Sequence, residues 1–346
     1  MQEMGNLDVF FLSRELASLE GARLDNAYQC GEKDFRFRFG KKDLVARLGE
    51  HAFLGERKPA PKSPSQFAML LRKHLRGKRV SSVGQVGFDR LLRVGFGGKS
   101  LVFELFSNGN LLLLDGERIV RPFKFEEFSA RTLKPGETYS PPPSAKEDPR
   151  TAEFPCKGKA VPALSKELEL PPFYLEEACA RAGVGFTEEL DAEKAAAIRE
   201  AALSLFSEAR PVLYLGGGKP LAFSPFPLKK MGGKEFKEFD SFSAALEEYY
   251  SFVSPSGAAP EKDFVREQRL KAITDFAVKE REAREAGDWL SANAFPVDRA
   301  LELVKQGKIG EARKKLGAKI TREGRFLRFE NEIGRASCRE RVCHRV

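Results

Sequence analysis

The segment with the clearest chemical potential is Gly87-Phe88-Asp89-Arg90, which places a carboxylate beside a guanidinium group. An arginine in such a segment can contact phosphate or stack on a base. An aspartate can accept a hydrogen bond from a base amino group or a ribose hydroxyl, which a lysine cannot do. The segment could instead have a purely structural role. In that interpretation it supplies a turn glycine, a core phenylalanine and two charged residues at the start of a strand.

A dense basic cluster precedes this segment, at the end of a predicted helix. Within eight positions the chain carries Arg72, Lys73, His74, Arg76, Lys78 and Arg79. Cations at a helix C-terminus interact favourably with the helix dipole, but two of them would meet that need. The others create a local field suited to phosphate, and we predict RNA-phosphate contacts for Arg72, Lys73, Arg76, Lys78 and Arg79.

Two glycine-rich segments invite comparison with phosphate-binding loops. Gly98-Lys99-Ser100 has Arg93 where a P-loop requires its first glycine. Gly216-Gly217-Gly218-Lys219 has no following Ser or Thr and no following helix pattern. We therefore predict a β-turn at the first segment and a hairpin turn at the second.

Residues that could act as nucleophiles or metal ligands are scattered. His51 and His74 have no neighbouring cysteine or carboxylate pattern, so we expect structural or surface roles for both. Cys30, Cys156 and Cys179 are isolated in the sequence, and each is predicted to be a small packed residue. The sequence therefore predicts no catalytic residue, no metal site and no cofactor.

The overall composition indicates the class of partner. Lysine and arginine exceed aspartate and glutamate by 59 to 50 in 346 residues, which gives a net charge of +9. This surplus favours polyanionic partners without identifying one. No apolar run approaches the roughly 18 residues of a membrane span, and the first residues do not resemble a secretory signal. We expect a folded, multidomain protein in the cytoplasm with no membrane partner.

The elements that position these residues follow from periodicity and turn signals in the first part of the chain. Residues 6–19 predict a helix in which Asn6 or Asp8 caps the start, and residues 65–75 predict a second helix. Phe35-Arg36-Phe37-Arg38-Phe39 alternates as a half-buried strand does. Further strands are expected at residues 91–96, 100–106 and 110–114, before a proline-rich linker at 141–150.

The second part of the chain changes to helical character. Helices are expected at residues 164–168, 174–181, 188–207 and 242–252, with strands at 212–215 and 219–223. Residues 262–305 are almost all helix formers with an imperfect apolar seam, which predicts a coiled-coil arm with a break at Pro296.

The last residues differ from the rest of the chain. Residues 332–346 look like a translated sequencing adapter, and we interpret them as an artefact outside the fold. Removing their four arginines and two glutamates lowers the net charge from +9 to +7. They also hold Cys338, Cys343 and His344, the close Cys/His cluster of the chain, so the metal hypothesis is dropped with them.

Several motifs occur together in a fixed order between residues 6 and 305. They are Leu7-Asp8, Glu15-Leu16, Gly21-Ala22-Arg23-Leu24, Asn26, Tyr28, residues 69–77, Gly87-Phe88-Asp89-Arg90, Glu104-Leu105-Phe106, Gly109-Asn110, Gly136, Tyr139, Pro141-Pro142, residues 164–183, Gly287-Asp288 and Ala292-Asn293. In this order they resemble the NFACT family, which includes the RqcH- and NEMF-type ribosome quality-control proteins. An older label for the family is fibronectin-binding protein A-like.

The resemblance implies an α+β, multidomain fold. It implies a β-rich NFACT-N domain at 1–150 similar to MutM-type DNA glycosylases, a helix-hairpin-helix-like module at 151–208 and a returning β/α segment at 209–258. The start of a coiled-coil middle region is expected at 261–331. Pro171-Pro172-Phe173 replaces the family's usual Gly-hydrophobic-Gly turn, which weakens the case for phosphate binding by that turn. The returning coiled-coil helix and the NFACT-R domain do not follow, and we interpret this as truncation.

The resemblance also implies a function. Such proteins bind a large ribosomal subunit that carries nascent peptidyl-tRNA, and they recruit aminoacyl-tRNA, typically alanyl-tRNA, for template-free C-terminal tailing. The family's functional residues in the first domain correspond to Asp8, Asp89 and Arg90, which are therefore expected to contact tRNA, with Asp8 as the partner of Asp89. The ribosome would make the peptide bonds, and this protein would not be an enzyme.

Two alternative functions remain for comparison. A DNA-glycosylase-like enzyme would need a proline at position two, where this chain has Gln2, and usually a cysteine-rich zinc finger. A fibronectin-binding surface adhesin would need export, for which the sequence has no signal, and the isolated cysteines suit a reducing compartment.

Overall fold

The structure is a computed structural model. It describes residues 2–61, 63–106 and 109–253, residues 276–316 except 277, 282, 286 and 290, and three strands between 319 and 339. These residues fall into two compact units, Met1–Phe264 and Val265–Val346. Both units combine helices with antiparallel strands, so the predicted α+β class is confirmed. Within the described residues, no helix is long and apolar enough to cross a membrane.

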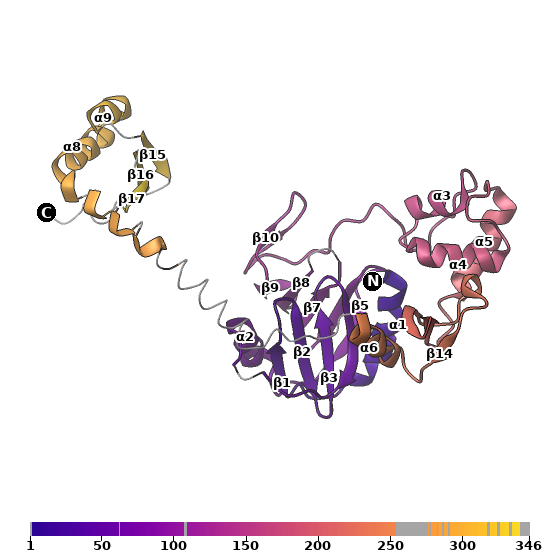
Figure 1. Cartoon of the computed structure of the whole chain (residues 1–346). Coiled ribbons are helices and arrows are strands. Elements are labelled where there is room, and N and C mark those ends of the chain that lie inside the picture. The colour runs from indigo at the N-terminus through magenta and orange to yellow at the C-terminus, as the bar shows by residue number, and fades with distance from the viewer. Residues whose placement is uncertain are drawn as a thin grey trace. The chain divides into compact units, whose positions relative to one another are not determined.

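Two antiparallel sheets form the β-rich N-terminal part of the first unit (Figure 1). The first sheet contains β1 (Asn26–Gln29), β2 (Asp34–Phe39), β3 (Lys42–Arg47) and β4 (His51–Glu56) in that order. The second sheet contains β5 (Ser82–Gln85), β6 (Leu91–Gly95), β7 (Lys99–Glu104), β8 (Asn110–Asp115) and β9 (Arg118–Pro122). A short hairpin follows, made of β10 (Glu126–Glu127) and β11 (Thr132–Leu133).

The two large sheets share one apolar core. Phe37 of β2 meets Phe103 of β7 edge to face, with ring centroids 5.4 Å apart. The backbones also approach closely where the Gly49 amide donates to the Glu104 carbonyl at 3.3 Å. A Cβ at Gly109 would lie 2.0 Å from the Gly49 nitrogen, so this approach requires glycine.

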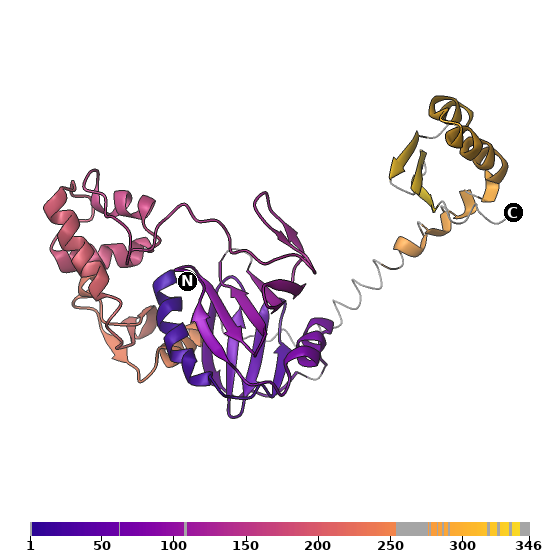
Figure 2. The same cartoon turned by 180° about the vertical axis from the view of Figure 1, so that it is seen from behind.

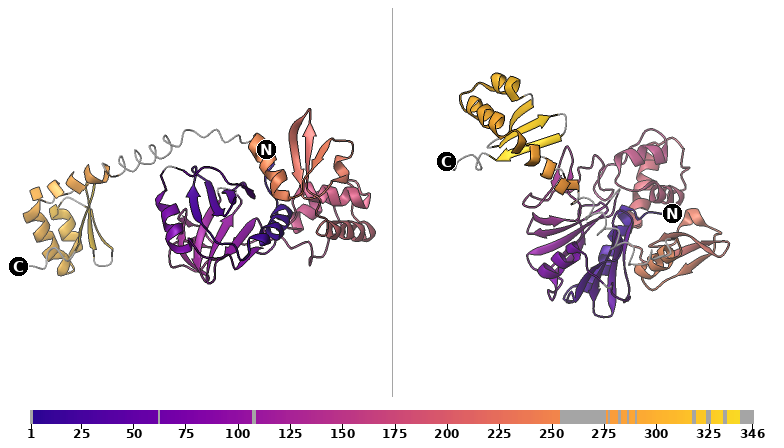
Figure 3. Two further views of the ribbon diagram at one scale, coloured as in Figure 1. Left: turned by 90° about the horizontal axis from the view of Figure 1, so that it is seen from below. Right: turned by 60° about the vertical axis from the view of Figure 1, so that its left-hand side comes forward.

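Helix α1 (Asn6–Leu16), extended by η1 (Ala17–Leu19), is the central element of the first unit. Figures 2 and 3 show it between the sheets and the helical part of the chain. Eight of its residues are buried, among them Leu7, Val9 and Phe11, because neighbours cover more than one of its faces. Its N-cap is Gly5, and Asp8 accepts from the Gly5 amide at 2.6 Å. The predicted cap at Asn6 is wrong, since that side chain points to another segment.

The helical module follows the linker. It contains α3 (Ala160–Glu167), α4 (Pro172–Ala182) and α5 (Ala192–Ser204). Pro171 and Pro172 lie at the start of α4, where a missing amide proton costs little. A Cβ at Gly5 would lie 2.6 Å from Pro171 Cγ, so this turn packs directly against the start of α1.

A small sheet and a helix complete the first unit. The sheet has the order β13-β12-β14, with β12 (Val212–Gly216), β13 (Lys219–Ser224) and β14 (Phe236–Glu238); η2 (Lys229–Met231) lies between the last two strands. Helix α6 (Phe242–Val253) packs on β4 and β13. The Tyr250 ring stacks on His51 with ring centroids 3.8 Å apart, and it lies tilted against Phe223 with centroids 5.6 Å apart. The amide of Phe242 donates to Glu15 of α1 at 2.8 Å, so α6 is tied to the central helix.

Helix α2 (Gln66–Leu75) begins at the predicted place. The hydroxyl of Ser65 accepts from the Ala68 amide at 3.1 Å, which is a normal N-cap. The turns at Gly97-Gly98 and Gly217-Gly218 join adjacent antiparallel strands, and all four glycines have positive φ. Both predictions of turns rather than phosphate loops are therefore confirmed.

The second unit has a small core of Val297, Ala300 and Ala312. It contains α8 (Ala294–Lys305), α9 (Ile309–Leu316), β15 (Lys319–Glu323), β16 (Phe326–Asn331) and β17 (Gly334–Arg339). The helical residues 291–292 end at the turn residue Asn293, and α8 then begins with Pro296 in its first turn, so the predicted break at this proline is confirmed. The coiled-coil prediction for 261–331 is wrong for 319–323 and 326–331, which pair as strands, and residues 262–275 lie outside the described chain. Strand β17 pairs with β16, so part of the segment excluded as an artefact has secondary structure.

Candidate nucleic-acid interface

The Gly87-Phe88-Asp89-Arg90 segment forms the turn between β5 and β6. Gly87 has a φ of +60°, which explains the glycine. Phe88 is buried, and the Asp89 carboxylate accepts from the Arg90 amide at 2.6 Å. Arg90 pairs with the exposed Glu3 at 3.0 Å. The structural features expected of such a turn are therefore present, together with two charged side chains at its surface.

Two amides fix this turn to the start of α1. Gln85 Nε2 donates to the carbonyls of Asn6 at 2.8 Å and Asp89 at 2.7 Å. Asn6 Nδ2 donates to the Phe88 carbonyl at 2.8 Å and to the Glu169 carbonyl at 3.0 Å. Because Glu169 precedes α4, the turn and the helical module are held by the same asparagine.

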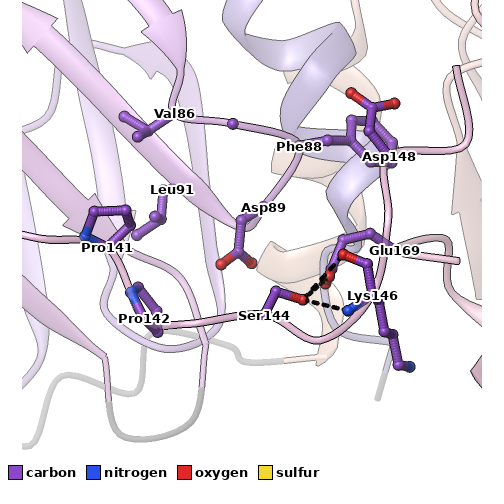
Figure 4. A pocket seen from close by; sticks show the side chains of 11 residues that line it. Val86, Phe88, Asp89, Leu91, Pro141, Pro142, Ser144, Lys146, Asp148 and Glu169 are labelled. Atoms are coloured by element: carbon purple, nitrogen blue, oxygen red, sulfur yellow. Dashed lines mark hydrogen bonds between the residues drawn. The ribbon is translucent and has the colours of Figure 1, made fainter. Parts of the chain in front are cut away.

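A pocket of about 170 Å³ lies beside the turn, between it, the linker and the helical module (Figure 4). It is lined by Val86, Gly87, Phe88, Asp89, Leu91, Pro141, Pro142, Ser144, Lys146, Asp148 and Glu169. A cavity of about 150 Å³ can hold a benzene ring, so this one has room for a small planar ring. Figure 4 shows the Asp89 carboxylate pointing toward Ser144 and Glu169. The pocket thus combines apolar walls with carboxylate acceptors.

The electrostatics of the pocket favour a hydrogen-bond donor. Burial raises the pKa of Asp89, and the nearby negative charge of Glu169 raises it further. The Arg90 amide, the Arg90 charge and the Arg131 charge oppose these effects. A ligand that brings amino protons would relieve the repulsion between the two carboxylates.

Asp8 lies in the interior, away from the pocket surface. Its side chain is 1% exposed, and its two oxygens accept from the Gly5 amide and from the Tyr174 hydroxyl. Burial raises the pKa of Asp8 to about 7. The expectation that Asp8 pairs with Asp89 in direct contact with tRNA therefore does not fit this arrangement, because Asp8 faces α4 instead.

The basic cluster lies at the other end of α1. Residues 78–80 bond to the backbone of residues 21–24, just after η1, whereas the pocket lies at Asn6. Fourteen helical residues separate these points, which is roughly 20 Å. The cluster and the turn are neighbours in sequence, but β5 carries the chain from one end of α1 to the other.

The predicted phosphate contacts differ in availability. Lys73, Arg76 and Arg79 are exposed, although Arg79 donates to the Gly21 carbonyl at 2.7 Å. Arg72 donates to the Ala27 carbonyl at 2.8 Å and lies 5.1 Å from the Tyr28 ring centroid. Lys78 is half-buried. Lys73 and Arg76 are therefore the best placed to meet phosphate.

Arg150 packs against three aromatic rings, one of which belongs to the pocket residue Phe88. The Arg150 guanidinium lies 5.2 Å from the ring centroid of Phe88, and 5.5 Å from those of Phe10 and Phe206. Asp148 accepts from Arg150 at 2.9 Å, which orients the guanidinium. These contacts join the linker to α1 and to the end of the helical module. The sequence contained no local signal for them, because their members are far apart in the chain.

His51 and Cys179 lie in the core, whereas Cys156 lies at the surface. His51 is buried, which lowers its pKa to about 3, so its ring is neutral and acts in packing. Cys179 is buried, and burial raises its pKa to about 11, as expected for an unreactive core thiol. Cys156 is exposed, so its predicted packed role is wrong.

Comparison with known proteins gives consistent matches. A family model described as NFACT N-terminal and middle domains matches residues 6–282. The archaeal Rqc2 homolog aRqcH of Methanocaldococcus jannaschii is 29% identical over 88% of this chain and 52% of its own length. Ribosome quality control complex subunit 2 of Saccharomyces cerevisiae is 42% identical over 34% of this chain and 12% of its own length. This chain thus spans about half the length of the archaeal relative and less of the yeast protein.

Solved structures show the same architecture. The fibrinogen binding protein from Staphylococcus aureus superposes with a TM-score of 0.58 at 21% identity, over 71% of this chain and 98% of that protein. At this level of identity the likeness establishes a common fold and carries no information about a common ligand.

Proposed function

Because the chain belongs to the NFACT family, we propose that it is a ribosome quality-control factor that recruits tRNA to a stalled large ribosomal subunit. Relatives that carry the name ribosome quality control complex subunit support this role. The proposal includes the large subunit, its nascent peptidyl-tRNA and an incoming aminoacyl-tRNA as partners. We further propose that this tRNA is alanyl-tRNA, used for template-free C-terminal tailing in the cytoplasm.

The observation that carries the proposal is the pocket lined by Asp89 and Glu169. Arg90 follows Asp89 in the chain but does not line the pocket. Two carboxylates beside apolar walls suit a planar base that presents amino protons. Among the residues that the structure describes, the Arg90 side chain pairs with Glu3, whose side chain is 62% exposed, and such an exposed pair is weak. Arg90 can therefore exchange Glu3 for a phosphate at little cost. In this proposal the protein is not an enzyme, since it orients tRNA while the ribosome makes the peptide bond.

The double variant Asp89→Ala/Arg90→Ala tests this assignment. We expect it to bind tRNA about 10- to 100-fold more weakly, because one carboxylate acceptor and one phosphate contact are lost. Filter binding and crosslinking measure the affinity, and co-sedimentation with large ribosomal subunits should persist. The matched control is Arg210→Ala/Glu238→Ala, which removes an exposed ion pair of 3.1 Å elsewhere in the unit. Unchanged tRNA crosslinking in the test variant would remove the site assignment.

A second prediction concerns the basic cluster. Replacing the exposed Lys73 and Arg76 by alanine should make RNA binding less sensitive to salt. The negative slope of log affinity against log salt concentration should become shallower by about 2, or about 0.9 for each lost phosphate contact with a duplex. The measurement is RNA affinity at several salt concentrations. Lys157→Ala/Lys159→Ala, which removes two exposed lysines of the helical module, is the control for net charge. Equal slopes for both variants would mean that only the total charge matters.

A further inference from the structure

We propose that Asn6, Asp8 and Tyr174 are positioning residues, which act on tRNA binding by holding the two walls of the pocket together rather than by touching RNA. This inference rests on the proposed function, because it concerns the same pocket. It gives Asp8 a role that its interior position allows, and it adds Asn6 from the same helix and Tyr174 from α4.

The first observation is that one asparagine spans both walls. Asn6 Nδ2 donates to the Phe88 carbonyl at 2.8 Å, on the wall that carries Asp89. The same nitrogen donates to the Glu169 carbonyl at 3.0 Å and lies 3.2 Å from Glu169 Oε1, on the opposite wall. Asn6 is 7% exposed, so water competes poorly for these bonds. The separation of Asp89 from Glu169 thus depends on the first turn of α1.

The second observation is a buried tie between two helix starts. Asp8 accepts from Gly5 at 2.6 Å and from the Tyr174 hydroxyl, and both acid and tyrosine are 1% exposed. Tyr174 lies in the first turn of α4, two residues after Pro172 and five after Glu169. Pro171 packs so closely on Gly5 that no side chain fits there. The tie therefore fixes the segment that presents Glu169.

These contacts form a continuous support under the binding surface. A site holds its ligand well only where a second layer of residues locks the groups that touch the ligand. Removing the Tyr174 hydroxyl would replace none of the residues that line the pocket. It would instead loosen the segment that carries Glu169. The effect on RNA would therefore be indirect.

The test is a double-mutant cycle measured on tRNA affinity. The proteins are the wild type, Asp8→Asn, Tyr174→Phe and the double variant, each confirmed to be folded by circular dichroism at the assay temperature. We expect each single variant to bind tRNA about 3- to 10-fold more weakly, as for the loss of one buried hydrogen bond. The double variant should bind no more weakly than the worse single variant, because both changes break the same tie.

Tyr214→Phe is the matched control. Tyr214 is also 1% exposed, and its hydroxyl accepts from the Leu228 amide at 2.7 Å, away from the pocket lining. It should lose comparable stability and keep its tRNA affinity. An equal loss of affinity in this control would reduce the effect of Tyr174 to general destabilisation and overturn the inference.

The remaining outcomes separate this inference from the proposed function. If Asp8→Asn weakens binding while Tyr174→Phe binds as the wild type does, Asp8 acts on RNA by another route and the positioning role is wrong. If neither single variant changes the affinity, the tie does not support the pocket. If the wild type itself does not bind tRNA, the proposed function fails and the inference falls with it.

Discussion

Raising the pH from about 3 to about 8 should cost the wild type roughly 4 kcal/mol of stability relative to Asp8→Asn. The unfolded chain ionises Asp8 near its ordinary pKa of 3.8, whereas burial raises the pKa of the folded carboxyl to about 7. Between these values the folded state binds more protons, so a rise in pH favours unfolding. Three pKa units correspond to about 4 kcal/mol. The stability contribution is thus present below about pH 4 and is lost as the pH rises through about 7.

Urea unfolding at several pH values between about 2 and about 8 measures this effect as a difference between the two proteins. Asp191→Asn provides a control of opposite sign. Asp191 caps α5 by accepting from the Lys194 amide at 2.8 Å, and this hydrogen bond holds its pKa below the ordinary value. The wild type should therefore gain stability relative to Asp191→Asn as the pH rises to about 4, and the difference should then stay constant up to about pH 8. Parallel curves for the wild type and Asp8→Asn would show that Asp8 ionises normally in the fold.

Glu104→Ala should destabilise the protein by about 3 to 5 kcal/mol, because it leaves a buried guanidinium without its partner. Glu104 and Arg131 are joined by two bonds of 2.6 and 3.2 Å, and their side chains are 2% and 5% exposed. Tyr139 adds a bond to the same carboxylate at 3.3 Å. Thermal and urea unfolding would measure the loss.

Two further variants separate the buried charge from the contact itself. Glu127→Ala removes an exposed ion pair with Lys134 on the same hairpin and should change stability by less than about 1 kcal/mol. Glu104→Leu/Arg131→Leu replaces both charges by apolar groups and should recover much of the loss. An effect of Glu104→Ala as small as that of Glu127→Ala would mean that Arg131 reaches water or another acceptor.

The Glu104–Arg131 pair also bears on the pocket. Arg131 contributes to the field at Asp89, and Tyr139 lies two residues before Pro141, which forms part of the pocket wall. Glu104 pairs in register with Leu91, which lines the pocket from β6. Loss of the carboxylate would therefore affect the pocket wall as well as the stability of the sheet.

Local sequence signals predicted most of the secondary structure of the first unit. The alternation at Phe35 to Phe39 became β2, and the Ser65 cap began α2. These predictions succeeded because periodicity and capping depend on residues within a few positions of one another. The second unit was predicted less well. The weak apolar seam before residue 305 favoured a helical arm, but it carries no information about residues 319–331, which form strands.

The candidate site was only partly predictable. The chemistry of Asp89 and Arg90 was evident from their types, and the motif order pointed to the NFACT family, to which the chain belongs. Glu169, Asn6 and Gln85 were not identified, although they complete or hold the pocket. Their contacts join residues 82, 163 and 79 positions apart, and no local spacing encodes such distances.

Sequence alone therefore determined the family, the local elements and the charged turn, because these follow from residue type and near neighbours. Tertiary structure decided which charges meet. It turned Asp8 inward toward Tyr174, since a carboxylate at the third position of a helix bonds back to its cap and, here, faces a packed module. It also separated the basic cluster from Asp89 by the length of α1, because β5 carries the chain along that helix.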